Sequence, residues 1–95
     1  MAAASLSILI PVYNYDIRPL VQGLSSQAEA LPLPVEILCF DDASDGQFRR
    51  LNASVGALPG VVYRLLPENL GRSRIRNLLA REAQHAYLLF IDCDS

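Results

Sequence analysis

The chain has 95 residues, 52% of them hydrophobic, and a formal net charge of −2. This composition is typical of one small globular domain and excludes a disordered chain, which has too little apolar surface to bury. The eight Lys and Arg residues do not outnumber the ten Asp and Glu residues. Nucleic acid is therefore excluded as the expected partner, because neutralising its phosphates requires a basic excess.

We expect no targeting signal in the first residues, because no basic residue precedes the apolar stretch that ends at Val12. That stretch is also too short, and too interrupted by Pro11, to span a bilayer. Cys39 and Cys93 have the spacing of neither a zinc site nor a disulfide framework. We therefore expect a cytoplasmic protein with no membrane segment in this chain.

The first half of the chain predicts a strand, a helix and a second strand. The run 6–12 is apolar and leads into turn-forming residues, as a buried strand does. Apolar residues then recur every three or four positions over 17–31, with Asp16 placed to cap this helix and Pro32 to end it. The segment 35–40 is apolar on nearly every residue, which is typical of a strand covered on both faces.

The second half repeats this alternation. A helical spacing over 48–58 precedes a strand over 61–66, and a helix over 73–84 precedes a strand over 87–91. The order β-α-β-α-β-α-β predicts an α/β fold, namely a Rossmann-like parallel sheet with right-handed crossovers and helices on both faces. The carboxyl ends of the first, second and fourth strands are then expected at one edge.

Acidic residues follow two of these strands. Asp92 and Asp94 are two residues apart, so in strand geometry both carboxylates point to one side and can reach one cation. Mg²⁺ or Mn²⁺ suits such oxygen ligands, whereas zinc would require Cys or His. Cys93 then points the other way and is expected to pack. The alternative is that the two aspartates only begin a surface turn.

Asp41 and Asp42 end the second strand as adjacent carboxylates, which repel each other unless a donor or a charge uses them. Asp42 is therefore a candidate for a contact with a base or a sugar. The alternative is again a turn, to which we assign Asp45. Tyr13, beside the end of the first strand, fits equally well a ring that stacks on a ligand and one that fills the crevice.

Three arginines surround a predicted helix start, where free N–H groups and the helix dipole favour an anion. On a helix Arg72 and Arg76 share a face while Arg74 lies nearly opposite, so the three cannot all serve one phosphate. His85 falls between a helix and a strand and is expected at the surface.

Four segments together resemble glycosyltransferase family 2. They are 7–14, 36–45, 69–71 with 76–77, and 90–94, and in order they cover essentially the whole chain. Each is a weak signal by itself, but four at this spacing are specific to the family. The resemblance implies the N-terminal part of a GT-A fold, in which residues 1–95 form one donor-binding domain of a longer protein.

The resemblance also implies an activity and a nucleotide site. The protein would transfer a sugar, with inversion, from a nucleotide-diphosphate donor, expected to be a UDP-sugar, to an acceptor that the sequence does not identify. Pro11 and Tyr13 would line the base pocket, and Asp42 would accept a hydrogen bond from the base with Asp41 in support. Arg76 belongs to the same donor-binding set.

The same resemblance implies a metal at the end of the fourth strand. Asp92 would meet the ribose or the metal, and Asp94 would ligate Mg²⁺ or Mn²⁺ bridging the diphosphate. Ser95 stands where many relatives have a third acid. The general base is expected beyond Ser95, so no residue of this chain is assigned a catalytic role. The resemblance leaves open whether the whole protein has membrane segments outside this chain.

Other functions fit part of the same pattern. The 95-residue chain by itself fits a non-catalytic nucleotide-binding or interaction module. Asp92 and Asp94 also fit the nucleophile and acid of a haloacid-dehalogenase-like phosphatase, although there the aspartates end the first core strand. A dinucleotide site is disfavoured because the turn 13–16 lacks glycine. Finally, an uncovered sheet edge predicts self-association of the chain.

Overall fold

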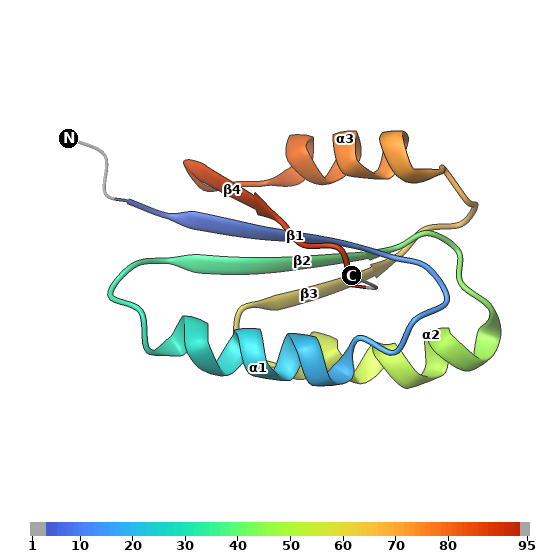
Figure 1. The fold of residues 1–95 in the computed structure, drawn as a ribbon, viewed down its shortest axis with the longest axis horizontal. Coiled ribbons are helices and arrows are strands. Elements are labelled where there is room, and N and C mark those ends of the chain that lie inside the picture. Colours follow the sequence, from blue (N-terminus) through green and yellow to red (C-terminus); the bar gives the residue numbers. More distant parts are fainter. Residues whose placement is uncertain (1–3, 94–95) are drawn as a thin grey trace.

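Four strands form one parallel sheet in the computed structural model, which describes residues 4–93 (Figure 1). They are β1 (Leu6–Val12), β2 (Val35–Asp41), β3 (Val61–Leu65) and β4 (Tyr87–Phe90). Their order across the sheet is β3-β2-β1-β4, so β1 and β2 lie in the centre. Both central strands are apolar on nearly every residue because both of their faces are covered.

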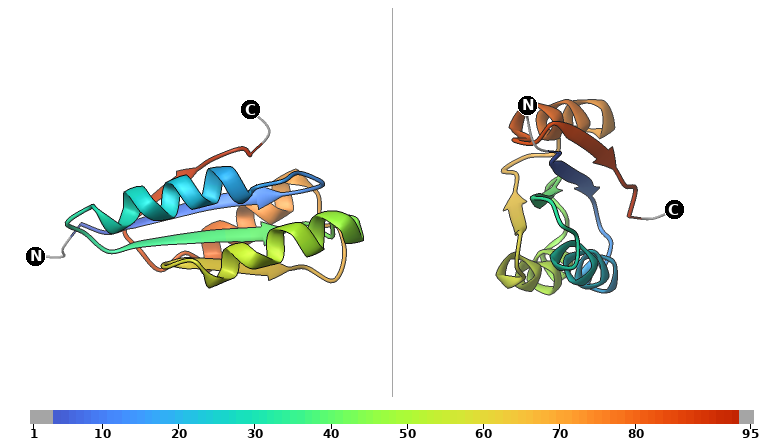
Figure 2. Two further views of the ribbon diagram at one scale, coloured as in Figure 1. Left: turned by 90° about the horizontal axis from the view of Figure 1, so that it is seen from below. Right: turned by 90° about the vertical axis from the view of Figure 1, so that its left-hand side faces the viewer.

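Helices cover the two faces of the sheet, as predicted. α1 (Arg18–Glu29) and α2 (Gly46–Asn52), which continues into the 3-10 helix η1 (Ala53–Ala57), lie on one face, and α3 (Arg72–Glu82) lies on the other. The end-on view in Figure 2 shows the sheet between these two layers. The predicted order of strands and helices is confirmed, with boundaries that differ by a few residues.

Alternate residues of the central strands divide the apolar core into two clusters. Toward α1 and α2, the strand residues Ile8, Ile10 and Ile37 pack with Val21 and Val55. Toward α3, Leu9, Leu38 and Phe40 pack with Ile75 and Leu79. The period of two along each strand therefore anchors helices on both sides of one sheet.

The second helix differs most from its prediction. The apolar spacing over 48–58 predicts one helix, whereas the α-helix ends at Asn52 and 53–57 is 3-10. Ser54, Val55 and Gly56 are weak α-helix formers, which explains the change in this segment.

At α1, Asp16 lies one residue before the N-cap position Ile17, yet its carboxylate accepts the N–H of Arg18 at 3.1 Å.

The edge strands differ from the central ones. β4 pairs only with β1 among the described residues, and its Tyr87, Leu88 and Leu89 side chains are exposed. The expected self-association rests on this edge and stays a prediction. No helix in the part of the chain that the structure describes is long and apolar enough to cross a membrane.

The strand order reverses at β1. From β1 the chain adds β2 and β3 on one side, and then α3 crosses the opposite face of the sheet to place β4 on the other side of β1 (Figure 1). Open α/β sheets form their ligand crevices at such a reversal, outside the carboxyl ends of the strands. The topology therefore directs attention to the ends of β1 and β4.

Candidate nucleotide-binding site

A pocket of about 290 Å³ lies at this reversal, and we call it the switch-point pocket. It brings together residues from the end of β1, the end of β2, the start of α3 and the segment after β4. These residues are Pro11, Val12, Tyr13, Asp42, Asn69, Gly71, Arg72, Ile75, Asp92 and Cys93. Of the residues that the sequence assigned to the donor site, Pro11, Tyr13, Asp42 and Asp92 line it, whereas Asp41 and Arg76 do not.

Asp42 is held by the backbone of the loop before α3. Its Oδ1 accepts the N–H of Leu70 at 2.6 Å and its Oδ2 accepts the N–H of Gly71 at 3.0 Å. Its carbonyl oxygen accepts a hydrogen bond from Asn69 Nδ2 at 2.9 Å. Gly71 is the N-cap of α3 with φ 89°, a left-handed conformation that suits glycine. The carboxylate thus lies at the N-terminus of α3, where the helix dipole favours it.

Asp41 is fully buried and does not line the switch-point pocket. Its Oδ1 accepts the N–H of Ser44 at 2.8 Å, and its Oδ2 accepts the hydroxyl of Tyr63 on β3. Burial, followed by this hydrogen bond, raises the pKa of Tyr63 well above its ordinary value of 10.0, so the hydroxyl keeps its proton and donates. Asp41 therefore fixes the turn after β2 and joins it to β3.

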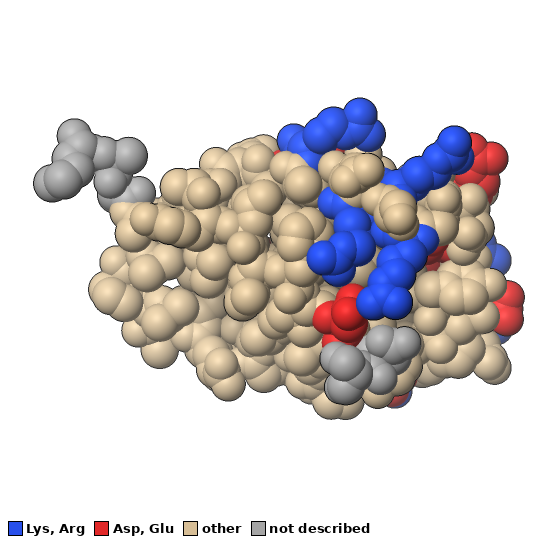
Figure 3. Space-filling model, turned by 45° about the horizontal axis from the view of Figure 1, so that its top comes forward, with Lys and Arg blue, Asp and Glu red and all other residues tan. Residues whose placement is uncertain are grey.

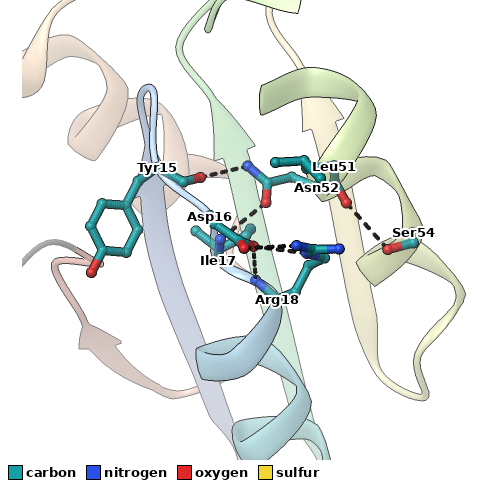
Figure 4. A network of polar contacts seen from close by, with 7 residues as sticks. All are labelled: Tyr15, Asp16, Ile17, Arg18, Leu51, Asn52 and Ser54. Atoms are coloured by element: carbon teal, nitrogen blue, oxygen red, sulfur yellow. Dashed lines mark hydrogen bonds and ion pairs between the residues drawn. The ribbon is translucent and has the colours of Figure 1, made fainter. Parts of the chain in front are cut away.

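The loop after β1, which carries Tyr13, is tied down by polar contacts that the sequence analysis did not predict. Asn14 has φ 49°; its N–H donates to Ser44 Oγ at 2.8 Å and its Oδ1 accepts the N–H of Asp45 at 2.8 Å. Buried Asn52 holds the far end of this loop (Figure 4). Its Oδ1 accepts the N–H of Ile17 at 3.0 Å, and its Nδ2 donates to the carbonyl of Tyr15 at 2.7 Å.

One feature of the sequence could have identified Asn52 as a structural residue. It lies within the helical spacing 48–58 as a polar residue that the fold buries completely. A buried amide requires partners, and here both of its ends find backbone groups of the loop after β1. No comparable signal identifies Tyr63 or Ser44, because a polar residue in a predicted strand or turn is ordinary and does not indicate a buried partner.

Asp92 is held by arginine side chains. Its Oδ2 accepts a hydrogen bond from Arg72 Nη2 at 3.0 Å, and its Oδ1 lies 3.7 Å from Arg76 Nη1. The Arg76 guanidinium also lies over the ring of Phe90, 4.2 Å from its centroid. The predicted shared face of Arg72 and Arg76 is confirmed, because both reach the same carboxylate, whereas Arg74 makes no ion pair with the described residues.

Of the eight basic residues, Arg72, Arg74, Arg76 and Arg81 lie on α3, whereas Arg18, Arg49 and Arg50 lie on the helices of the opposite face. All eight are arginine, and Figure 3 shows several of them close together with acidic side chains beside them. Positive charge at a helix start is unfavourable with respect to the dipole. Asp42 and Asp92 offset it, since one lies against the N–H groups just before α3 and the other pairs with its arginines.

The predicted metal site is described only in part. Asp94, its second expected ligand, and Ser95 lie outside the described residues. Within 4–93 no group of three or more His, Cys, Asp or Glu side chains could hold a metal ion. Asp92 offers a hard oxygen ligand that suits Mg²⁺ or Mn²⁺, whereas each Asp42 oxygen already accepts a backbone N–H.

The remaining candidates lie where the sequence analysis expected packing or surface. Cys39 and Cys93 are free thiols; Cys39 is buried in the core, and burial raises its pKa to about 12. Cys93 packs against the same cluster, with its Sγ 3.6 Å from the carbonyl oxygen of Pro11. His85 is half-buried near the start of β1, where its N–H donates to Ser7 Oγ at 3.2 Å. None of these side chains but Cys93 lines the switch-point pocket.

The fold and the pocket define a class of protein, namely a doubly wound parallel α/β domain with a ligand site at its switch point. A profile of the family described as glycosyl transferase family 2 matches residues 7–95. The chain therefore belongs to this family. No sequence among the curated proteins matches it significantly.

Solved structures show the same fold, that of the N-terminal part of GT-A enzymes. S. aureus TarS 1–349 is 24% identical with a TM-score of 0.75, and the match covers 95% of this chain and 27% of that one. For the same protein in complex with UDP-GlcNAc, the sequence identity is 24% and the TM-score 0.69, and the match covers 95% of this chain and 26% of that one. The mannosyltransferase PcManGT from Pyrobaculum calidifontis was solved in complex with GDP-Man and Mn²⁺. Its sequence identity to this chain is 21% and the TM-score is 0.65, and the match covers 94% of this chain and 27% of that one. The chain thus spans about a quarter of these relatives.

Proposed function

We propose that the protein is a glycosyltransferase and that its switch-point pocket binds the nucleotide diphosphate of an activated sugar. One observation carries the proposal: Tyr13, Asp42 and Asp92 come from three different strand ends and line one pocket. Open α/β sheets bind nucleotides at such a position. Family membership supports sugar transfer, and the relatives crystallised with UDP-GlcNAc and GDP-Man support a nucleotide-linked donor.

The ends of β1 and β2 supply the groups for the nucleobase. Pro11 and Tyr13 offer apolar and aromatic surface on which a ring can stack. Each Asp42 oxygen accepts one backbone N–H and retains a second lone pair. The carboxylate can therefore accept the single imide N–H of uracil, which supports a UDP-sugar as the donor.

The segment after β4 and the start of α3 supply the groups for the ribose and the diphosphate. Asp92 would accept from ribose hydroxyls or, together with Asp94, hold Mg²⁺ or Mn²⁺, and the related mannosyltransferase was crystallised with Mn²⁺. Such a cation, when bound, stabilises charge on a departing diphosphate. Arg76, packed on Phe90, keeps a positive charge beside Asp92.

Donor binding and catalysis would then belong to different parts of the protein. Residues 1–95 form one donor-binding domain of a longer protein, whose acceptor pocket and general base lie elsewhere, and the transfer inverts the anomeric centre. The two free thiols support a cytoplasmic location. The 95-residue chain alone is expected to transfer no sugar, and turnover with any nucleotide sugar would contradict that expectation.

Calorimetric titration with UDP, with and without Mn²⁺, tests the donor site. We expect binding that Mn²⁺ strengthens, and we expect Asp94→Asn to abolish the metal-dependent part because it removes a proposed ligand. Glu68→Gln is the control, since Glu68 is an exposed carboxylate in the loop before α3 with no hydrogen bond or ion pair to the described residues. A folded chain that binds no UDP under either condition would contradict the proposal.

A further inference from the structure

Two arginines reach Asp92, but they are anchored very differently. The side chain of Arg76 is 37% exposed and lies over the Phe90 ring, and its Nη1 is 3.7 Å from Asp92. The side chain of Arg72 is 76% exposed, and its hydrogen bond to Asp92, at 3.0 Å, is the shorter contact. Only Arg72 lines the switch-point pocket. The arginine with the shorter contact to Asp92 is therefore also the more exposed one.

The position of Arg72 makes it dependent on a nearby anion. It is the first residue of α3, where the dipole disfavours a positive charge. Asp42 is already engaged by the N–H groups of Leu70 and Gly71, so Asp92 is the carboxylate that pairs with Arg72. An exposed ion pair of this kind contributes little to stability. A stronger anion that enters the pocket can therefore attract Arg72 away from Asp92.

We propose that Arg72 is an exchangeable counter-ion: it pairs with Asp92 until the donor binds and then transfers to the diphosphate. This inference rests on the proposed function of the switch-point pocket. A guanidinium binds phosphate oxygens through paired N–H donors, which makes this exchange favourable. The exchange removes one of the two arginines that pair with Asp92, and so makes its carboxylate more available to the ribose or the cation when the diphosphate arrives.

The proposal predicts effects of opposite sign on two ligands. Without Arg72, Asp92 loses a competing positive charge and should bind Mn²⁺ alone more tightly. The diphosphate loses a partner, so UDP without metal should bind more weakly. Uridine has no phosphate and should bind as before. A merely structural role for Arg72 would shift all three affinities in the same direction.

The test compares Arg72→Gln with Arg74→Gln, an identical charge change on the same helix at a residue that pairs with no described carboxylate. Binding is measured calorimetrically for UDP and uridine and by paramagnetic resonance for Mn²⁺. For Arg72→Gln we expect UDP affinity to fall about tenfold, as loss of one charge-assisted contact implies, and Mn²⁺ affinity to rise several-fold. Arg74→Gln should match the unchanged chain, and Arg72→Lys should recover part of the UDP affinity.

The outcomes separate the two proposals. Equal affinities for Arg72→Gln and Arg74→Gln would overturn the exchange of Arg72 and leave the nucleotide site intact. A parallel loss of UDP and uridine binding in Arg72→Gln would also overturn it, because it would indicate a local structural change. If the unchanged chain binds neither UDP nor uridine, the proposed function itself fails.

Discussion

The switch-point pocket has two carboxylates that are held in opposite ways. Asp42 is 5% exposed and bonds two backbone N–H groups of the loop before α3. Asp92 has a side chain that is 34% exposed and pairs with two arginine side chains. Backbone groups cannot move without the loop, whereas arginine side chains rotate independently. The pocket therefore combines a fixed half at β2 with an adaptable half at β4.

This difference fits the two parts of the ligand that we propose. A planar base is recognised by donors and acceptors at fixed positions, and fixed groups lose little freedom when the ligand binds. A diphosphate and its cation bring charges of both signs into the site, so that site requires side chains that can exchange partners. The following predictions test this comparison, from the largest expected effect to the smallest.

Asp42→Asn should have the largest effect on stability. The amide presents N–H donors to one of the two backbone N–H groups that the carboxylate accepts, so that group loses its partner. We expect a loss of about 3 kcal/mol, because hydrogen bonds to a charged group are among the stronger ones. Urea unfolding measures it, with Glu68→Gln as the matched control. Equal midpoints for the two variants would show that the fixed half is not held by Asp42.

Tyr63→Phe tests how far the fixed half extends. The change leaves Asp41 Oδ2 buried without the hydroxyl that it accepts, which should cost about 2 kcal/mol. Tyr87→Phe is the control, since Tyr87 is exposed on β4 and makes no hydrogen bond through its side chain to the described residues. The same unfolding experiment serves both variants, and a Tyr63→Phe chain as stable as its control would contradict the prediction.

Asp92→Asn should affect binding and hardly affect stability. Exposed ion pairs are worth less than about 1 kcal/mol, so unfolding should change by no more than that. UDP binding in the presence of Mn²⁺ should fall at least about tenfold, as loss of a charged contact implies. Glu82→Gln is the control, because Glu82 forms an exposed pair with Arg64 at 3.5 Å and is absent from the pocket lining. If Asp92→Asn destabilised the chain as much as Asp42→Asn, the two halves would not differ.

Asp16 and Arg18 provide a reference for an arginine–carboxylate pair outside the pocket (Figure 4). Hydrogen bonds from the Arg18 side chain and backbone lower the pKa of Asp16 from its ordinary 3.8 to about 2. A lowered folded-state pKa adds stability that is present above pH 3.8 and is lost as the pH falls toward 2. In Arg18→Gln the pKa of Asp16 should rise toward its ordinary value, as NMR titration would record. An unchanged pKa would contradict this assignment.

The sequence predicted the sheet, the alternation of helices and the edge at which the site lies, because apolar periodicity and strand ends carry that information. Pro11, Tyr13, Asp42 and Asp92 meet at one pocket for this reason. The helical period also separates Arg72 from Arg74. These features depend on spacing along the chain.

Polar contacts between distant segments could not be predicted in this way. Tyr63 meets Asp41, and Asn52 meets the loop after β1, across 22 and 35 residues of sequence. No periodic pattern records which partner a buried polar group finds. The same applies to Asp42, whose position suggested a ligand contact and whose backbone partners appear only once α3 is packed on the sheet.

The backbone bonds of Asp42 have a consequence for amide hydrogen exchange. Leu70 and Gly71 belong to a surface loop, where amides ordinarily exchange with solvent within the shortest times. Here both amides donate to a carboxylate that is anchored at the end of a central strand. Their protection should therefore resemble that of strand amides in β1 and β2. The turn into α3 should therefore open to solvent as rarely as the central strands of the sheet do.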